Sequence, residues 1–358
     1  MYNYRSVTNV VVNFLGLFMP VTLKDIAKHT GLSVSSVSNI LSGNDPRYNE
    51  ETRERVMEAA RKLDYHPHRA ARIMQGRGSG VFGVLVPDLS FSYFPEIIRG
   101  IERVADDAGY QLLLCQTHYD PKDMMRKLSL LREHCVDGLI LFPIPFSQES
   151  DVQKGMKYLP FPVICVDSKM EGFTCDFVGT DDYHGAYNAT MHLCQQGRSR
   201  IACVTFGDDS PIKRARLKGY RDALHDCNLP LDDSLCVPGP WDIDTPADEL
   251  LSLFHETDKP DGLFCMSDLM AIWASMRLKD EGFSIPADIA VIGFGGLFEG
   301  KWFDPPLTTM TQKMEEMGGR AVNMLLERIK HPKNPVKEIL LEPELTIRAS
   351  SGAEKSAD

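Results

Sequence analysis

The apolar residues between 21 and 43 recur at the spacing of two short amphipathic helices. Gly31 interrupts the pattern with a tight turn, and Ser33 can cap the second helix by accepting a hydrogen bond from an otherwise unpaired backbone N–H. Two short helices joined in this way form a helix-turn-helix, whose second helix can lie in the major groove of DNA. A helical hairpin in an unrelated α domain is the alternative. The positions at helical spacing are Leu23, Ile26 and Ala27 in the first helix and Val37, Ile40 and Leu41 in the second.

A third amphipathic helix is predicted from Glu51 to about Asp64, with Asn49 as its cap. Three short helices can enclose a small core, whereas two cannot do so well. This third element favours the DNA-binding interpretation and predicts a helix-turn-helix domain over 20–66. The residues expected to face its core are Val56, Ala60 and Leu63.

Residues 67–78 predict a short hinge helix followed by a linker. Pro67 is suited to the first turn of a helix, and Gly76 and Gly78 end it. A helix of one or two turns is not stable alone. It can fold when DNA phosphates neutralise its arginines, which are Arg69, Arg72 and Arg77.

From Val81 onward, short continuous apolar runs alternate with amphipathic helical stretches, of which 95–109 is the clearest. Strands that are apolar throughout and separated by helices are typical of parallel sheets covered on both faces. We favour two doubly wound α/β lobes over one large sheet, with the break near Val178–Asp182, where an apolar run ends in acidic and polar residues. The strand-like runs are 81–86, 111–116, 138–142, 163–166, 201–206, 262–266 and 289–294.

Charge is divided unevenly along the 358 residues, whose net charge is −11. In residues 20–78, Lys and Arg outnumber Asp and Glu by 10 to 7, whereas in residues 79–358 the acids lead by 43 to 28. A mildly basic head on an acidic body suits contact with DNA through the head.

Cysteine usage and the N-terminus bear on the compartment. Nine cysteines are scattered without a CxxC pair, and several lie inside apolar runs, which favours reduced thiols in a cytoplasmic protein over a zinc site or a disulfide framework. Residues 1–19 hold an apolar run that is too short to span a membrane and lacks a small-residue cleavage site. We expect this extension to be disordered, with Met19 able to serve as the translation start. No later segment approaches a transmembrane helix.

Four N-terminal segments occur in an informative order: VTLKDIA, GLSVSSVSNIL, TRERV and LDYHPHRAAR. Together they resemble the lactose/galactose repressor (LacI/GalR) family. The resemblance implies a hinge helix that enters the minor groove, where Met74 stands in place of a leucine that wedges between base pairs. Asn39 stands where an arginine is frequent, so the family's operator sequence is not carried over. The candidate DNA-contacting residues are Thr22, Ser33, Val34, Ser35, Ser36, Ser38, Asn39, His68, Arg69, Ala71 and Met74.

The same resemblance continues to about residue 350, through segments such as YFPEII, VDGLI, RLKGY and PPLTT. It implies a periplasmic-binding-protein-like clamshell of two lobes over 79–350, between which the family's chain crosses three times. The helix around 313–330 is therefore expected to return to the first lobe and the last strand, 338–347, to pack in the second. The tail, 351–358, has no leucine heptads and predicts no tetramerising helix. The expected lobes are about 79–178 with 310–335, and about 179–309 with 336–350.

Residues that follow strands are the candidates for a ligand pocket, because open α/β lobes bind ligands at the carboxyl ends of their strands. An arginine with carboxylates can hold hydroxyls or anions, and an aromatic ring can stack on the apolar face of a sugar. The candidate effector-binding residues are Tyr93, Phe94, Asp181, Ser210, Arg216, Trp241, Ser267 and Asp268.

Three of these candidates, Arg216, Trp241 and Asp268, match positions that line the effector pocket in the family. Each has a purely structural alternative: a surface salt bridge for the arginine, ordinary core packing for the tryptophan and a helix cap for the aspartate. Tyr93 and Phe94 could likewise belong wholly to the core.

Gly295 departs from the family, in which an aspartate that holds the effector's polar groups is common at this position. Either another residue substitutes for that carboxylate or the ligand differs from a free hexose. We therefore expect simple hexoses to bind weakly or not at all. The glycines around it do not have the spacing of a dinucleotide-binding loop.

The leading functional prediction is a cytoplasmic transcriptional regulator of the repressor type. It is expected to bind a pseudo-palindromic operator as a homodimer under the control of a sugar-like effector. A secreted sugar-binding protein for transport is the alternative, and the helix-turn-helix disfavours it. An enzyme is disfavoured because HExxH, GxSxG and Walker motifs are missing from the sequence. We expect no cofactor, no metal and no membrane partner.

Overall fold

The computed structural model describes residues 21–41, 47–65, 78–144, 150–240 and 244–352. The chain divides into two compact units at the junction of Ser79 and Gly80, and each is described by itself. The predicted extension, 1–19, and nearly all of the predicted hinge segment, 67–78, lie outside the described residues. Within the described ranges, no helix combines the length and apolarity that a membrane span needs.

The N-terminal unit contains the three predicted helices, α2 (Leu23–Thr30), α3 (Val34–Leu41) and α4 (Glu50–Lys62). Gly31 ends α2 with a φ of 70°, a left-handed conformation that glycine adopts without strain. The Ser33 hydroxyl accepts from the Ser36 N–H at 3.0 Å, and Asn49 accepts from the Thr52 N–H at 3.0 Å, so both predicted caps are confirmed. The fully buried core residues are Ile26, Val37 and Val56, with Ala27, Ile40 and Ala59 beside them.

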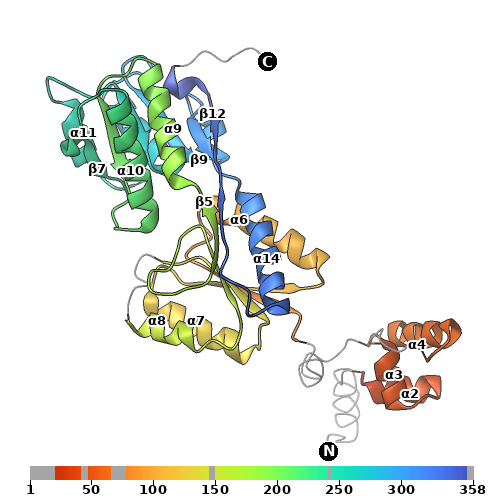
Figure 1. The fold of residues 1–358 in the computed structure, drawn as a ribbon. Coiled ribbons are helices and arrows are strands. Elements are labelled where there is room, and N and C mark those ends of the chain that lie inside the picture. Colours follow the sequence, from red (N-terminus) through yellow and green to blue (C-terminus); the bar gives the residue numbers. More distant parts are fainter. Residues whose placement is uncertain (1–20, 42–46, 66–77, 145–149, 241–243, 353–358) are drawn as a thin grey trace, which may run out of the picture. The chain divides into compact units, whose positions relative to one another are not determined.

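The larger unit contains two six-stranded sheets with helices packed around each (Figure 1). All pairings in the first sheet are parallel, and in the second only β12 runs antiparallel, to β10. The strand order is β11-β5-β4-β3-β1-β2 in the first sheet and β12-β10-β9-β8-β6-β7 in the second. The strands are β1 (Val81–Val86), β2 (Gln111–Gln116), β3 (Gly138–Leu141), β4 (Val163–Val166), β5 (Asp176–Thr180), β6 (Ile201–Thr205), β7 (Cys236–Pro238), β8 (Gly262–Cys265), β9 (Ala290–Gly295), β10 (Thr308–Thr311), β11 (Glu338–Leu341) and β12 (Glu344–Thr346).

Helices cover both faces of the first sheet, which explains why its strands read as continuous apolar runs. In β1, Val84 faces a core shared with α6 and α14, whereas Leu85 faces a second core shared with α7 and α8. The helices of the unit are α6 (Tyr93–Asp107), α7 (Pro121–Glu133), α8 (Ser150–Lys157), α9 (Asp182–Gln195), α10 (Pro211–Asp226), α11 (Asp248–Phe254), α12 (Asp268–Asp280), α13 (Glu299–Trp302) and α14 (Met314–Lys330), with 3-10 turns at Asp233–Leu235 and Ala349–Ser351.

Two glycines allow α6 and α14 to pack in close contact on the first lobe. A Cβ added to Gly100 would lie 2.0 Å from the Glu315 carbonyl oxygen, and one added to Gly318 would lie 2.1 Å from that of Ile97. The helix predicted around 313–330 therefore returns to the first lobe, as expected.

The chain crosses between the lobes three times, but the last crossing differs from the prediction. The stretch predicted as one strand of the second lobe, 338–347, is divided: β11 pairs with β5 in the first sheet, and β12 pairs with β10 in the second. Pro343 lies between them and cannot donate to a strand ladder, so the pairing breaks there. The other crossings follow β5 and β10, which places residues 179–180 in the first sheet and 310–311 in the second.

Candidate effector pocket and DNA-binding helices

The first turn of α3 presents small polar groups and one apolar side chain. Val34 is 40% exposed and Ser35 is exposed beside it. The Ser33 hydroxyl lies 2.8 Å from that of Ser36, so the turn carries a short row of hydroxyls. Hydroxyl groups can donate to or accept from bases and phosphates. The remaining predicted contacts in described residues, Ser38, Asn39 and Thr22, are partly or fully exposed.

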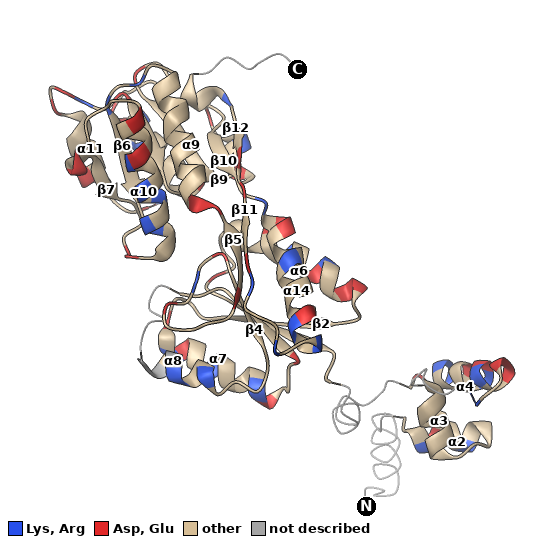
Figure 2. Cartoon of the chain, viewed as in Figure 1, with Lys and Arg blue, Asp and Glu red and all other residues tan. Residues whose placement is uncertain are grey.

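Of the three described helices of this unit, α2 and α4 carry charged residues, whereas α3 carries none (Figure 2). At the start of α2, the Asp25 carboxylate accepts from the Thr22 hydroxyl at 2.7 Å and from the Thr22 N–H at 2.9 Å. These two hydrogen bonds lower the pKa of Asp25. The predicted hinge contacts His68, Arg69, Ala71 and Met74 lie outside the described residues.

A cavity of about 180 Å³ lies between the two lobes of the larger unit. Its walls are rich in aromatic rings and contain several ionisable groups. The lining residues include Phe91, Tyr93, Phe94, Phe142 and Asp167 from the first lobe, and Phe206, Ser210, Arg216, Ser267 and Phe294 from the second. Most of them follow the carboxyl end of a strand or begin the next helix, which is where such lobes bind ligands.

Arg216, on α10, is both a cavity residue and one half of a buried salt bridge. Its Nε lies 2.8 Å and its second guanidinium nitrogen 2.7 Å from one oxygen of Asp182, and its third nitrogen donates to the Met266 carbonyl. The guanidinium carbon sits 3.5 Å from the centroid of the Phe294 ring. Only 4% of the residue is exposed, so its position is fixed before any ligand arrives. Burial raises the pKa of Asp182, and Arg216 opposes that shift.

Asp167 forms the corresponding centre on the first lobe. It follows β4 with a φ of 70°, and its carboxylate accepts from the Tyr93 hydroxyl. The Tyr93 oxygen is also 3.3 Å from Oε1 of Gln312, which in turn accepts from the Thr180 hydroxyl at 2.6 Å. Burial raises the pKa of Asp167 to about 6, even though the Tyr93 hydrogen bond opposes the change.

Asp268 does not line the cavity; it holds the loop that does. This fully buried carboxylate accepts from the Gly296 and Leu297 N–H groups at 2.7 Å each and from the Thr309 hydroxyl at 2.5 Å. Burial raises its pKa. Gly295 lies in the wall with a φ of 151°, and a Cβ there would be 3.2 Å from Asp268 Oδ2. Because Gly295 has no side chain, the Asp268 carboxylate has room directly behind this part of the cavity wall.

The remaining predicted effector-binding residues lie in different places. Asp181 is outside the cavity wall, because it caps α9 by accepting from the His184 N–H at 3.1 Å and contacts the His184 ring at 2.7 Å. Its neighbour Asp182 is the residue that contacts Arg216. Trp241 lies outside the described residues, although Pro240 beside it lines the cavity. Ser210 and Ser267 line the cavity as predicted and also cap α10 and α12.

Comparison with known families decides which class of protein carries these two sites. Residues 22–68 match the family described as bacterial regulatory proteins, lacI family. Residues 79–348 match the family described as periplasmic binding proteins and sugar binding domain of LacI family. The chain belongs to the LacI family of bacterial regulatory proteins.

Relatives of this LacI-family chain match it over more than three quarters of its length. The HTH-type transcriptional repressor PurR of Haemophilus influenzae (strain PittEE) is 31% identical over 92% of this chain and 98% of its own. A LacI-family regulator from Enterococcus faecium, solved with bound ribose, is 28% identical over 77% of this chain and all of its own, with a TM-score of 0.66. The lac repressor dimer bound to operator and an anti-inducer has the same fold, with a TM-score of 0.81 at 24% identity over 94% of this chain and all of its own.

The LacI-type motifs indicate cavity residues mainly in the second lobe, and they do not indicate most of the cavity residues of the first lobe. Phe142, Asp167, Phe206 and Gln312 each directly follow a strand, so the rule that found Ser267 would also have found them. Tyr119 and Asp208 lie further into loops and carried no comparable signal. Among the described residues, no group of three or more His, Cys, Asp or Glu side chains could hold a metal ion.

Proposed function

We propose that this chain is a homodimeric transcriptional repressor whose affinity for a pseudo-palindromic operator changes when a small polar ligand occupies the cavity between its lobes. The observation that carries the proposal is Arg216 in the wall of that cavity, stacked on Phe294 and fixed from behind by Asp182, on a chain that also bears a helix-turn-helix. A secreted transport protein would share the clamshell but has no use for the N-terminal unit.

The DNA side of the proposal rests on α3. Its exposed first turn offers hydroxyls and Val34 to a major groove, and one such helix reads too few base pairs for a specific site. Pairing of two chains supplies the second half-site. We propose α6 and α7 as the paired helices; Leu130, on α7, leaves 37% of its surface exposed.

The hinge completes the proposed link between ligand and DNA. In this scheme, residues 67–78 fold as a helix on the operator, with Met74 as the apolar wedge in the minor groove. A change in how the first lobes meet would decide whether two such helices can form together, which couples the two sites by linkage.

The ligand side rests on contacts that join the lobes around the cavity. The Ser92 hydroxyl on the first lobe donates to Glu299 on the second at 2.8 Å, and Arg214 on the second lobe pairs with Glu171 on the first. A ligand that touches both walls adds to or replaces these contacts and so shifts the equilibrium between open and closed lobes.

We propose a ligand that is sugar-like in its hydroxyls but not a simple free hexose. Aromatic rings can cover the apolar face of such a molecule, and Arg216 and Asp167 can bind its hydroxyls from opposite walls. The ribose bound to the Enterococcus faecium relative is consistent with this class. Gly295 supplies no carboxylate, and Asp167 is the residue that substitutes for it.

The test is an operator selected from random DNA, followed by binding of the full chain with and without a panel of free pentoses, hexoses, disaccharides and nucleobases. The binding constant for the operator should fall with salt concentration, with a log–log slope of about −0.9 per phosphate contacted. Asn39→Ala on α3 should lose specific affinity, whereas Ser252→Ala, exposed on α11 of the second lobe, should not. A flat salt response, or no ligand that shifts operator affinity, would refute the corresponding half of the proposal.

A further inference from the structure

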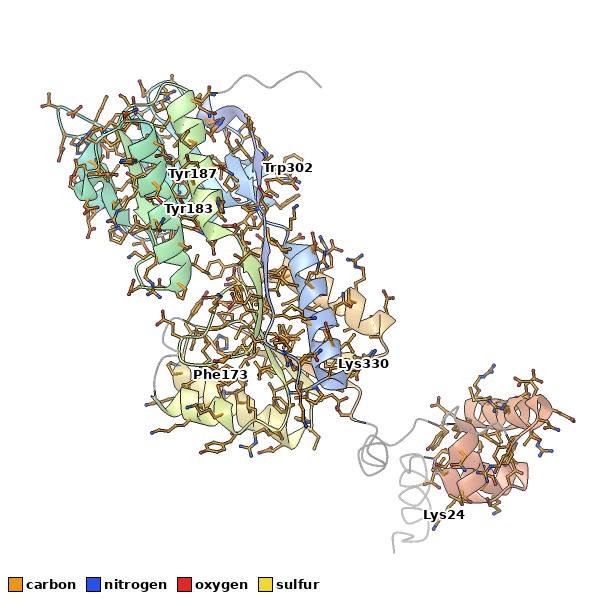
Figure 3. All side chains as sticks on the ribbon, in the orientation of Figure 1. Lys24, Phe173, Tyr183, Tyr187, Trp302 and Lys330 are labelled. Atoms are coloured by element: carbon orange, nitrogen blue, oxygen red, sulfur yellow. The ribbon has the colours of Figure 1, made fainter. Side chains whose placement is uncertain are left out.

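Two thiols of the first lobe lie in contact at the base of a loop that forms part of the cavity wall. The sulfur atoms of Cys165 and Cys175 are 3.1 Å apart. The segment between them supplies four cavity residues and includes Phe173, which is labelled in Figure 3. The four are Asp167, Ser168, Lys169 and Glu171.

The first sheet fixes the backbone positions of both cysteines. Cys165 lies in β4 with 1% of its surface exposed, and Cys175 directly precedes the parallel neighbour strand β5. The next residue, Asp176, is anchored by Arg328 at 2.7 Å and by the Lys337 N–H at 2.8 Å. Since a disulfide is about 2.05 Å long, the sulfur atoms need to approach by only about 1 Å.

We propose that Cys165 and Cys175 form a reversible disulfide when a hydroperoxide reaches Cys175, and that this bond fixes the cavity-lining segment 167–174. Any effect of this bond on effector binding rests on the function proposed above. The bond itself does not.

The reaction balances with hydrogen peroxide as the oxidant. The Cys175 thiolate attacks one peroxide oxygen, the O–O bond breaks, and the leaving hydroxide takes up a proton to become water. Cys175 is then a sulfenic acid. The Cys165 sulfur attacks the Cys175 sulfur, the S–O bond breaks, and the departing hydroxide leaves as water with the Cys165 proton. Two thiols are oxidised to one disulfide and the peroxide is reduced to two waters.

The surroundings assign the order of attack. Cys175 is partly exposed, and its hydrogen-bonding contact with the Cys165 sulfur lowers its pKa. The same hydrogen bond, together with burial, raises the pKa of Cys165 well above its ordinary value. The thiolate is the reactive form of cysteine, so the accessible Cys175 reacts first and the buried Cys165 resolves.

Other cysteines of the chain could also react with peroxide and are removed from the test protein. Cys203 and Cys236 lie opposite each other on β6 and β7 of the second lobe, and neither they nor their neighbours 204 and 235 line the cavity. Cys135 is the exposed cysteine of the described residues. Working in a Cys135→Ser, Cys236→Ser background removes the exposed thiol and the second pair together.

The experiment treats the full chain in this background with hydrogen peroxide, alkylates the remaining thiols with N-ethylmaleimide and identifies the peptides by mass spectrometry. We expect Cys165 and Cys175 to appear in one cross-linked peptide that has lost two hydrogens and separates on reduction with dithiothreitol. Cys165→Ser should instead leave a sulfenic acid on Cys175 that dimedone traps. Full alkylation of both cysteines after peroxide, or cross-linking of either to another cysteine, would overturn the proposal.

Hydrogen exchange tests the structural consequence without any effector. Oxidation should slow amide exchange in residues 168–174 by at least about tenfold, since local opening is restricted, and reduction should reverse it. Cys175→Ser should show no change with peroxide. Unchanged exchange in a protein shown to carry the bond would refute the claim that it fixes the loop. If the bond forms and exchange slows while no ligand alters operator binding, the proposed function fails and this inference stands.

Discussion

Two carboxylates near the cavity, one on each lobe, are stabilised in different ways. On the second lobe, Asp182 is compensated by a guanidinium that contacts it through two nitrogens. On the first lobe, Asp167 faces a tyrosine hydroxyl, and its pKa rises to about 6. A charge paired with a cation is stable but costly to disturb, whereas an unpaired one is poised to gain a proton or a ligand donor. The second wall is therefore a fixed platform and the first wall the responsive side.

The largest effect is expected from breaking the platform. Arg216→Ala leaves Asp182 buried without its partner, which should lower the free energy of unfolding by about 3–5 kcal/mol and abolish any ligand response. The double variant Arg216→Met, Asp182→Leu removes both charges and should recover most of that stability while still failing to respond. Urea unfolding and operator binding measure the two effects. A double variant no more stable than Arg216→Ala would show that the pair is not the source of the loss.

On the responsive wall, Asp167→Asn should act in the opposite direction. Because the pKa of Asp167 is raised on folding, the folded chain binds more protons than the unfolded chain between pH values of about 4 and 6. The free energy of unfolding contributed by this group falls as pH rises through that window and stays low above it. Asparagine cannot ionise, so the variant should be more stable at pH 7.5 by up to about 3 kcal/mol, and by much less near pH 4.

Denaturation at both pH values checks this. An equal shift of stability at pH 4 and pH 7.5 would assign the effect to packing and not to the proton on Asp167.

A change at Gly295, in the cavity wall of the second lobe, should lower the stability less. Gly295→Ala places a Cβ 3.2 Å from Asp268 Oδ2 at a φ of 151°, which should cost about 1–3 kcal/mol. Gly207→Ala is the matched control, since a Cβ there has no neighbour within 4 Å. Thermal unfolding compares the two. Equal melting temperatures would mean that the loop yields and that Asp268 does not hold it rigidly.

The smallest effect is expected at the rim. Ser92→Ala removes one exposed hydrogen bond between the lobes, worth about 1 kcal/mol or less. Stability should hardly change, whereas the midpoint of a ligand titration should shift by a few-fold, because the bond exists only when the lobes are close. A shift in stability without a shift in the titration would contradict its assignment as a lobe-closing contact.

The sequence was most informative where periodicity and motif agreed. Three helices of the N-terminal unit and the seven predicted strand runs correspond to elements of the structure, with ends shifted by a residue or so. The strands β5, β7 and β10 are not among the predicted strand runs, and the division of 338–347 depends on Pro343 and on pairing with two distant partners. Such long-range register leaves no local pattern to recognise.

In the pocket, Arg216 could be predicted because its motif and its place after a strand point the same way. Asp167 directly follows β4, so its place near the pocket could be predicted by the same rule, but its contact with Tyr93, 74 positions away in the chain, could not. Asp268 shows the converse: its place after a strand predicts a pocket residue, but its carboxylate accepts from backbone N–H groups of a loop and does not line the cavity.

The three crossings also constrain the order in which the protein can fold during synthesis. The first sheet needs β11, and its helical layer needs α14, both of which are made after the whole of the second sheet except β12. At about 5–20 residues per second, the ribosome takes many seconds to pass from β5 to β11, and β5 has a bare edge throughout that time. The N-terminal unit, which is continuous in sequence, faces no such delay. A nascent chain therefore acquires its three-helix head early and closes both lobes almost together, when β11 and β12 emerge.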